Sequence, residues 1–257
     1  MEISFITTPK PGDDLPFRNA LGNWHALDAE VLVLDGNERQ AKELGYRHIV
    51  DCERGAFDLP YLNSMVNLAR DQALGKFLVL TSDHLIFLSG LSSAIRLVSE
   101  RFDEFFIVGR RYDLDLNEID YRGDWKSTLW AVLQERGGIG SPAAKDYFIF
   151  PKSLEITIPP FLVGREWWDT WFVWYARQKH IPMIDATQLI LGIHQNHKFL
   201  TVDGSKKPLT FDDAGVYNER LFWSLVKNPK KGFGSIDYVP HEVVKDGQGN
   251  WVLSDRT

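Results

Sequence analysis

Phe77-Leu-Val-Leu-Thr-Ser-Asp-His-Leu-Ile-Phe87 is the stretch of sequence that decides the fold. Its apolar start predicts a buried strand at Phe77–Leu80, and the apolar run stops at polar residues that end in Asp83. A buried strand that carries a carboxylate at its C-terminal end is how an open α/β sheet places a ligand in its crevice. Carboxylate oxygens suit Mg²⁺ or Mn²⁺, ions that also suit diphosphates. The structural alternative is that Asp83 only caps the next helix.

Strand and helix patterns alternate over roughly the first 110 residues, which predicts βαβ units on a mostly parallel sheet. The predicted strands are Ile3–Thr7, Val31–Leu34, Arg47–Val50, Phe77–Leu80 and Phe105–Val108, and the predicted helices are Phe17–Leu27, Asn37–Leu44, 62–73 and 88–98. Neither GxGxxG nor GxxxxGK[ST] occurs, so the dinucleotide fingerprint and the P-loop are both missing.

The regular alternation of strand and helix patterns ends after Arg111. Helices are predicted at Trp125–Arg136 and Gly164–Lys179, and strands at Tyr147–Phe150, Pro182–Ile184 and Leu189–Ile193. Beyond Thr201 the chain is more polar, and apolar residues on both sides of 246–249 predict a hairpin. We expect one compact unit with an accessory C-terminal segment.

Bulk composition excludes several classes of protein. The 257 residues carry a net charge of −6, which argues against a general nucleic-acid binder. The single cysteine, Cys52, allows neither an internal disulfide framework nor a cysteine-based zinc site. The N-terminus has no signal-peptide pattern, and no apolar run approaches the roughly 20 residues of a membrane span. These features predict a cytoplasmic protein and leave its oligomeric state open.

Nine segments, in this order and spacing, resemble a family of glycosyltransferase-like proteins with the GT-A, nucleotide-diphospho-sugar transferase fold. They are Glu43-Leu-Gly-Tyr-Arg-His-Ile49, Pro60-Tyr-Leu-Asn-Ser64, Thr81-Ser-Asp83, Val108-Gly-Arg-Arg-Tyr-Asp113, Asp146-Tyr-Phe-Ile-Phe150, Pro159-Pro-Phe-Leu-Val-Gly-Arg165, Trp168-Asp-Thr-Trp171, Ile184-Asp-Ala-Thr187 and Ile193-His-Gln-Asn-His197. The resemblance runs from about Pro16 to His197. It implies an α/β protein with a Rossmann-like, mostly parallel sheet flanked by helices and with an acceptor-side C-terminal part.

The resemblance also implies a division of the chain. Residues 1–200 would form the GT-A domain, with a nucleotide-sugar-binding half at 1–115 and an acceptor-side half at 116–200. Residues 201–257 would be an accessory segment packed on the same domain.

A divalent ion, Mn²⁺ or Mg²⁺, is implied at the donor diphosphate. Asp83 matches the acidic residue of the family's metal motif, but Thr81 stands where a two-acid DxD has its first acid. One carboxylate holds such an ion only when phosphate oxygens, waters and a second protein ligand complete its shell. His194 and His197 are the candidates for that ligand, and we favour His197. The alternative is that both histidines only make hydrogen bonds in a loop.

Asp169 resembles the acidic residue that begins the acceptor-side helix in inverting enzymes of this fold, where a carboxylate takes the proton of the acceptor hydroxyl. Glu166 is its nearest rival. The structural alternative is that Asp169 only complements the helix dipole while Trp167, Trp171 and Trp174 form core.

Other residues are implied at the nucleotide-sugar site by the same resemblance. They are Thr7, Thr8, Pro9, Asp35, Asn63, Ser82, Arg110, Arg111 and Asp146. An arginine at a strand end can clamp phosphate, or it can simply form a surface salt bridge. Asp146 can bind sugar hydroxyls or cap a turn. Asp185 is expected to be a structural cap for the turn before Thr187.

The leading functional hypothesis is therefore an enzyme, a metal-dependent hexosyl- or pentosyltransferase. It would move a sugar from a nucleotide diphosphate to an acceptor hydroxyl on a glycan, a lipid carrier, a protein or a modified nucleobase. One alternative is a sugar-phosphate nucleotidyltransferase, although Thr8-Pro-Lys-Pro-Gly12 is a poor version of the loop that such enzymes need. The other is a degenerate, non-catalytic sugar-binding or scaffold protein, because the first acid of DxD is lost.

Overall fold

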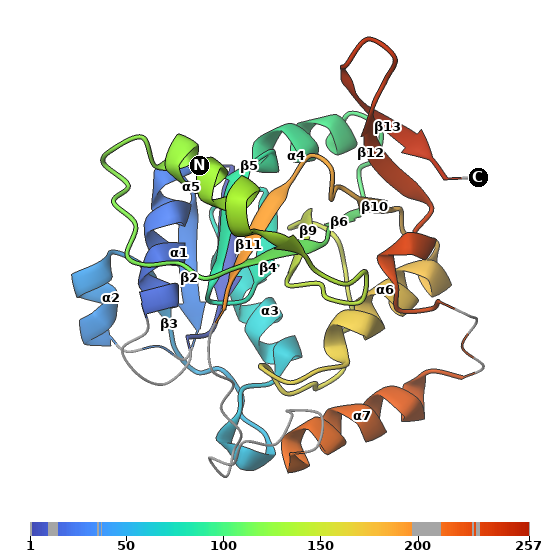
Figure 1. Ribbon diagram of the computed structural model, residues 1–257. Coiled ribbons are helices and arrows are strands. Elements are labelled where there is room, and N and C mark those ends of the chain that lie inside the picture. The colour runs from blue at the N-terminus through green and yellow to red at the C-terminus, as the bar shows by residue number, and fades with distance from the viewer. Residues whose placement is uncertain are drawn as a thin grey trace.

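The nine strands of the main sheet run across the middle of the molecule (Figure 1). The structure, a computed structural model, describes residues 2–9, 15–34, 36, 38–196, 212–227, 229 and 232–256. In spatial order the strands are β13 (Trp251–Asp255), β12 (His241–Lys245), β10 (Met183–Asp185), β6 (Phe106–Val108), β9 (Tyr147–Pro151), β4 (Phe77–Thr81), β1 (Ile3–Thr7), β2 (Glu30–Leu34) and β3 (Arg47–Ile49). All of them run parallel except β9 and β13.

Helices cover both faces of this sheet because its central strands are apolar on both sides. One face packs against α1 (Leu15–Ala26), α2 (Glu38–Leu44) and α4 (Leu91–Ser99). The other packs against α3 (Leu62–Gln72), α6 (Trp168–Lys179) and α7 (Asp213–Leu225). Short 3₁₀ turns lie at η1 (Ala56–Asp58) and η3 (Ile236–Tyr238).

A second sheet of four strands stands beside the first. Its spatial order is β5 (Leu85–Ser89), β11 (Leu191–Gln195), β7 (Arg111–Leu114) and β8 (Gly138–Ile139). Helix α5 (Trp125–Arg136) covers one of its faces, where Leu129 and Leu133 pack on Ile86 and Ile193. The turn from β4 to β5 therefore carries the chain from one sheet into the other.

The predicted fold class, a mostly parallel α/β sheet flanked by helices, is confirmed. The hairpin around 246–249 is also confirmed, and its strand β12 extends the main sheet beside β10. No helix in the described ranges combines the length and the apolar character that a membrane crossing requires.

Three predictions about individual elements are wrong. Leu88 belongs to strand β5, so α4 begins only at Leu91. Helix α6 begins at Trp168 rather than at Gly164, because Gly164 and Trp167 both have left-handed backbone angles, with φ of 76° and 82°. Strict alternation of strand and helix fails at β4 and β5, which follow one another directly.

Candidate active site

The carboxyl ends of β1, β4, β6 and β10 meet at one edge of the main sheet, and antiparallel β9 begins there. At the end of β4, Ser82 donates its backbone N–H to the carbonyl of Asp146 at 3.1 Å. Asp83 follows with only 3% of its surface exposed, and its Oδ1 lies 2.8 Å from Nδ1 of His84. The chain therefore buries the predicted metal-binding carboxylate beside an imidazole.

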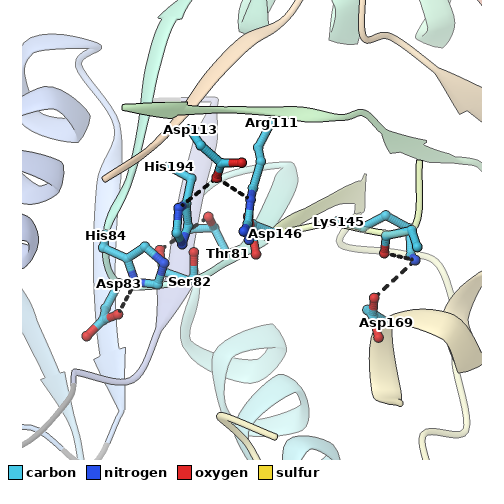
Figure 2. A network of polar contacts seen from close by, with 11 residues as sticks. Thr81, Ser82, Asp83, His84, Arg111, Asp113, Lys145, Asp146, Asp169 and His194 are labelled. Carbon is cyan, nitrogen blue, oxygen red and sulfur yellow. Dashed lines mark hydrogen bonds and ion pairs between the residues drawn. The ribbon is translucent and has the colours of Figure 1, made fainter. Parts of the chain in front are cut away.

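Two histidines join the two sheets at this point. The ring of His84 meets the ring of His194, on β11, edge to face with 4.6 Å between centroids. Nδ1 of His194 lies 3.0 Å from Oδ1 of Asp113, an ion-pair distance without the alignment of a hydrogen bond. Figure 2 shows His84 between Asp83 and His194, with the Asp83 carboxylate directed away from His194.

Arg111 lies between two carboxylates. Its Nε donates to Asp113 at 2.9 Å and its Nη1 donates to Asp146 at 2.6 Å. Burial works against the charged guanidinium, but Asp146 and then Asp113 outweigh it and raise the pKa of Arg111. The arginine predicted to clamp phosphate is thus held inside the protein by two acids.

Asp169, the predicted base, lies in the first turn of α6 and pairs with a buried lysine. Its Oδ2 is 3.1 Å from Nζ of Lys145, whose side chain is wholly buried, whereas the Asp169 side chain is 20% exposed. Of the neighbouring tryptophans, Trp171 is core, and Trp167 and Trp174 pack at the margin of that core. Glu166, the alternative candidate for the base, is an exposed residue.

These contacts form two groups at the edge of the sheet, one from Asp83 to Asp146 and one between Lys145 and Asp169, which adjoin through the backbone (Figure 2). Lys145 and Asp146 are consecutive in the chain. Lys145 pairs with Asp169, and Asp146 accepts a hydrogen bond from Arg111. Within the described residues, Arg111 pairs with Asp113 and Asp146, Lys145 pairs with Asp169, and Asp83 lies beside His84. That part of the chain holds no group of three or more His, Cys, Asp or Glu side chains that could bind a metal ion alone.

Three predicted donor-site residues have a buried side-chain oxygen without a hydrogen-bond partner in the described part of the chain. They are Thr7 at the end of β1, Ser82 after β4, and Asn63 in the first turn of α3. Thr8 and Pro9 continue from β1 and are half-buried. Because buried polar atoms are normally satisfied, such atoms at a sheet edge are candidates to contact a ligand.

Arg110 and Asp185 have structural partners. The guanidinium Nε of Arg110 donates to the carbonyl of Gly140 at 2.7 Å, and its backbone N–H donates to Thr187 Oγ1 at 2.8 Å. Asp185 accepts from the backbone N–H of Thr187 at 2.9 Å, which confirms its predicted capping role. The predicted residues Asp35 and His197 lie outside the described residues.

Sequence reasoning missed a buried amide pair that holds the β11 end of the site. Asn19 Nδ2 donates to Gln195 Oε1 at 2.8 Å, across 176 positions of the chain. Gln195 Nε2 in turn donates to the carbonyls of Pro16 and His84 at 2.8 and 2.9 Å. Two residues so far apart in the sequence produce no local pattern that would pair them. The position of Gln195 directly after His194 was a hint that it lies near the site.

No protein-family model matches the chain, and no curated protein matches its sequence. The comparison with solved structures finds GT-A glycosyltransferases, the family that the motifs resemble. A mannosyltransferase from Pyrobaculum calidifontis, solved with GDP-Man and Mn²⁺, is 13% identical with a TM-score of 0.48; the match covers 77% of this chain and 57% of the mannosyltransferase.

Two further solved structures also match this chain at low sequence identity and low TM-score. The glucosyl-3-phosphoglycerate synthase of Mycobacterium tuberculosis, in complex with Mn²⁺, UDP and phosphoglyceric acid, is 13% identical with a TM-score of 0.46, over 99% of this chain and 86% of the synthase. S. aureus TarS 1-349 is 16% identical with a TM-score of 0.33, over 47% of this chain and 38% of its own. At these identities and TM-scores, the similarity transfers no activity and no residue role to this chain.

Proposed function

We propose that this protein transfers a hexose or pentose from a nucleotide-diphosphate sugar to an acceptor hydroxyl, with the help of a divalent ion. The observation that carries the proposal is the pair of adjoining polar groups at the carboxyl edge of the sheet, with Asp83 in one and Asp169 in the other. Ligands of open α/β sheets bind at this edge. Two carboxylates separated in this way can serve the donor and the acceptor respectively.

Asp83 would hold the ion on the donor side. The described residues there leave more carboxylates than cations, so the chemistry of the donor set fits a divalent cation. His197 is the favoured second protein ligand in this proposal and His194 is the alternative, with phosphate oxygens and waters completing the shell. When bound, such an ion neutralises the charge of the diphosphate leaving group.

The donor nucleotide would lie over the ends of β1 and β4. Thr7, Ser82 and Asn63 supply the buried oxygens that lack a partner in the described part of the chain, and Thr8, Pro9 and Asp35 would line the base and ribose. Asp146, oriented by Arg111, would accept hydrogen bonds from sugar hydroxyls. Arg110 would face phosphate from the neighbouring strand end.

Asp169 would act as the base on the acceptor side. One of its oxygens pairs with Lys145, and no hydrogen bond engages the other oxygen in the described ranges. A partly exposed carboxylate of this kind can take the proton of an attacking hydroxyl. Trp168 is half-buried beside it and would pack on a sugar face.

The test is calorimetric titration of nucleoside diphosphates and their sugars with and without Mn²⁺. We expect one nucleotide to bind in a metal-dependent way, and Asp83→Ala to abolish that dependence. Asp120→Ala is the matched control, because Asp120 is an exposed acid that pairs with Arg122 on the surface.

Three outcomes would contradict the proposal. Full metal-dependent binding and transfer by Asp83→Ala would remove Asp83 from the donor site. Absence of binding across the panel would favour a non-catalytic scaffold. Release of pyrophosphate from a nucleoside triphosphate and a sugar phosphate would instead point to a nucleotidyltransferase.

A further inference from the structure

Lys145 is held by two hydrogen bonds and one ion pair. Nζ donates to the carbonyl of Ala143 at 2.7 Å and to the carbonyl of Gly234 at 3.0 Å, and it lies 3.1 Å from Oδ2 of Asp169. Its side chain has no exposed surface. A buried ammonium is tolerated only when its donors are matched, so these three contacts determine where the charge lies.

One of the acceptors comes from the far C-terminal part of the chain. Gly234 is 89 positions from Lys145, and its backbone packs on the first turn of α6. A methyl group added at Gly234 would stand 2.5 Å from Cγ2 of Thr170, the residue next to Asp169. The segment Phe233–Ile236 therefore lies directly against the start of the helix that carries the proposed base.

The same segment is fixed on its other side. The backbone N–H of Ile236 contacts the carbonyl of Pro142 at 3.4 Å, and the Ile236 side chain is fully buried in the core beneath α6. Phe233 stacks on Phe222 of α7. The carbonyl of Gly234 is thus presented by a packed segment and not by a free loop.

We propose that Lys145 is a positioning residue for Asp169, and that the segment Phe233–Ile236 sets the direction of Lys145. This inference rests on the proposed function, because it takes Asp169 as the base. Two backbone carbonyls fix the ammonium by hydrogen bonds, and this holds its charge 3.1 Å from Oδ2 of Asp169. The carboxylate then presents its other oxygen toward the acceptor side, and part of the predicted accessory segment becomes a component of the site.

The test is a double-mutant cycle on the full chain, with Lys145→Met and Asp169→Asn measured singly and together. We expect Lys145→Met to lower kcat on the order of 100-fold, the size expected when a reacting group is misplaced by about 1 Å. The donor KM should stay unchanged. In the Asp169→Asn background, Lys145→Met should cause no further loss, because its effect acts through that carboxylate.

A control variant that breaks a distant ion pair distinguishes a loss of positioning at Asp169 from a general loss of stability. Arg47→Met removes the partner of buried Glu30 at the opposite edge of the sheet. We expect this control to lower thermal stability but to leave kcat per folded molecule unchanged in both backgrounds. Gly234→Val keeps Lys145 and is also expected to lower kcat. In the Asp169→Asn background it should cause no further loss, as for Lys145→Met. This variant tests the inference even if Lys145→Met does not fold.

The failures can be told apart. Multiplicative effects of Lys145→Met or Gly234→Val with Asp169→Asn, in an enzyme that transfers sugar, would overturn the positioning role alone. A change confined to the donor KM would do the same. A wild-type protein that turns over no nucleotide sugar would overturn the proposed function and this inference together.

Discussion

The hydroxyl of Tyr147 is enclosed at the first position of β9. The residue is fully buried, and its oxygen has no hydrogen-bond partner in the described part of the chain. Burial, and then the charge of Asp185, raises the pKa of Tyr147 well above its ordinary value. The oxygen fits only because residue 109 has no side chain, since a Cβ there would overlap it.

Gly109→Ala should therefore destabilise the fold. We expect a loss of roughly 1–3 kcal/mol in the free energy of unfolding, as for other overpacked cores, measured by urea denaturation. Adding Tyr147→Phe should recover most of that loss, because it removes the overlapping oxygen. Gly123→Ala is the control, since no atom lies within 4 Å of the added methyl group. Equal losses with and without Tyr147→Phe would contradict this account.

Strands β1, β2 and β3 are tied together at the amino edge of the sheet by one carboxylate. Glu30, 5% exposed, accepts from Ser4 Oγ at 2.5 Å and from the backbone N–H of Leu74 at 2.7 Å, and it also pairs with Arg47. Burial alone would raise the pKa of Glu30, but these three partners outweigh it and lower the pKa below its ordinary value of 4.5.

The sign of this shift predicts how stability changes with pH. A carboxyl group whose pKa is lower in the folded state stabilises the protein above its unfolded pKa, and that contribution is lost as pH falls through the folded value. We expect the free energy of unfolding to decrease below pH 4.5, and Glu30→Gln to reduce the slope. Glu43→Gln, at an exposed i,i+4 pair, should leave the slope unchanged. Urea titrations at several pH values measure the effect, and identical slopes for Glu30→Gln and wild type would refute it.

Helix α7 holds the loop that leads into α6. Asn218 is fully buried and accepts from the backbone N–H of Leu162 at 2.8 Å. It donates to the carbonyls of Leu162 and Glu166, both at 3.0 Å. A second clamp is the buried pair of Arg165 with Asp212, the N-cap of α7. The backbone before Asp169 thus depends on a helix far along the chain.

Asn218→Ala should cost on the order of 2–4 kcal/mol, because it leaves two buried backbone groups of Leu162 and the partly buried carbonyl of Glu166 without this partner. Asn218→Asp should also destabilise, since a carboxylate cannot donate to the two carbonyls. Urea denaturation measures both variants, with Arg220→Ala, exposed on the same helix, as the control. Stability of Asn218→Ala within about 0.5 kcal/mol of wild type, the range for harmless surface changes, would contradict the clamp.

Periodicity in the sequence predicted most of the elements, because a buried helix face or strand leaves a local pattern. The end of β1, the start of α3 and all of α5 lie where the pattern placed them. The end of strand β5 was mistaken for the start of α4, since Leu88 and Leu91 also fit helical spacing. Helix α7 was missed because its core residues, such as Phe222, are few among polar neighbours.

The site was only partly predictable for a related reason. Asp83 could be selected from its position at the end of a strand, and Asp169 from the resemblance to enzymes of the GT-A fold. Their partners could not, because contacts such as Lys145 with Gly234 depend on how distant segments fold together. The second sheet could not be predicted either, because β5, β7 and β11 are far apart in the sequence and pair only in the folded chain.

A chain that ends at residue 200 should not fold cooperatively. Within the described residues, the predicted accessory segment supplies five buried apolar side chains to the two main core clusters, those of Phe222, Val226, Ile236, Val239 and Val243. At roughly 1.5–3 kcal/mol each, their loss is comparable to the whole stability of a typical domain, about 5–15 kcal/mol. We expect a broad urea transition and binding of a hydrophobic dye. A sharp transition would show that residues 1–200 form a domain of their own.

The position of β9 also has a consequence during synthesis. Among the described strands, β6 lies between β9 and β10, and both are made after it. Strands β1 to β4 can pair as soon as they leave the ribosome, but the apolar residues of β6 must wait for β9 to insert next to β4. At roughly 5–20 residues per second this wait lasts seconds. Over that interval the nascent chain presents a short hydrophobic segment of the kind that chaperones bind.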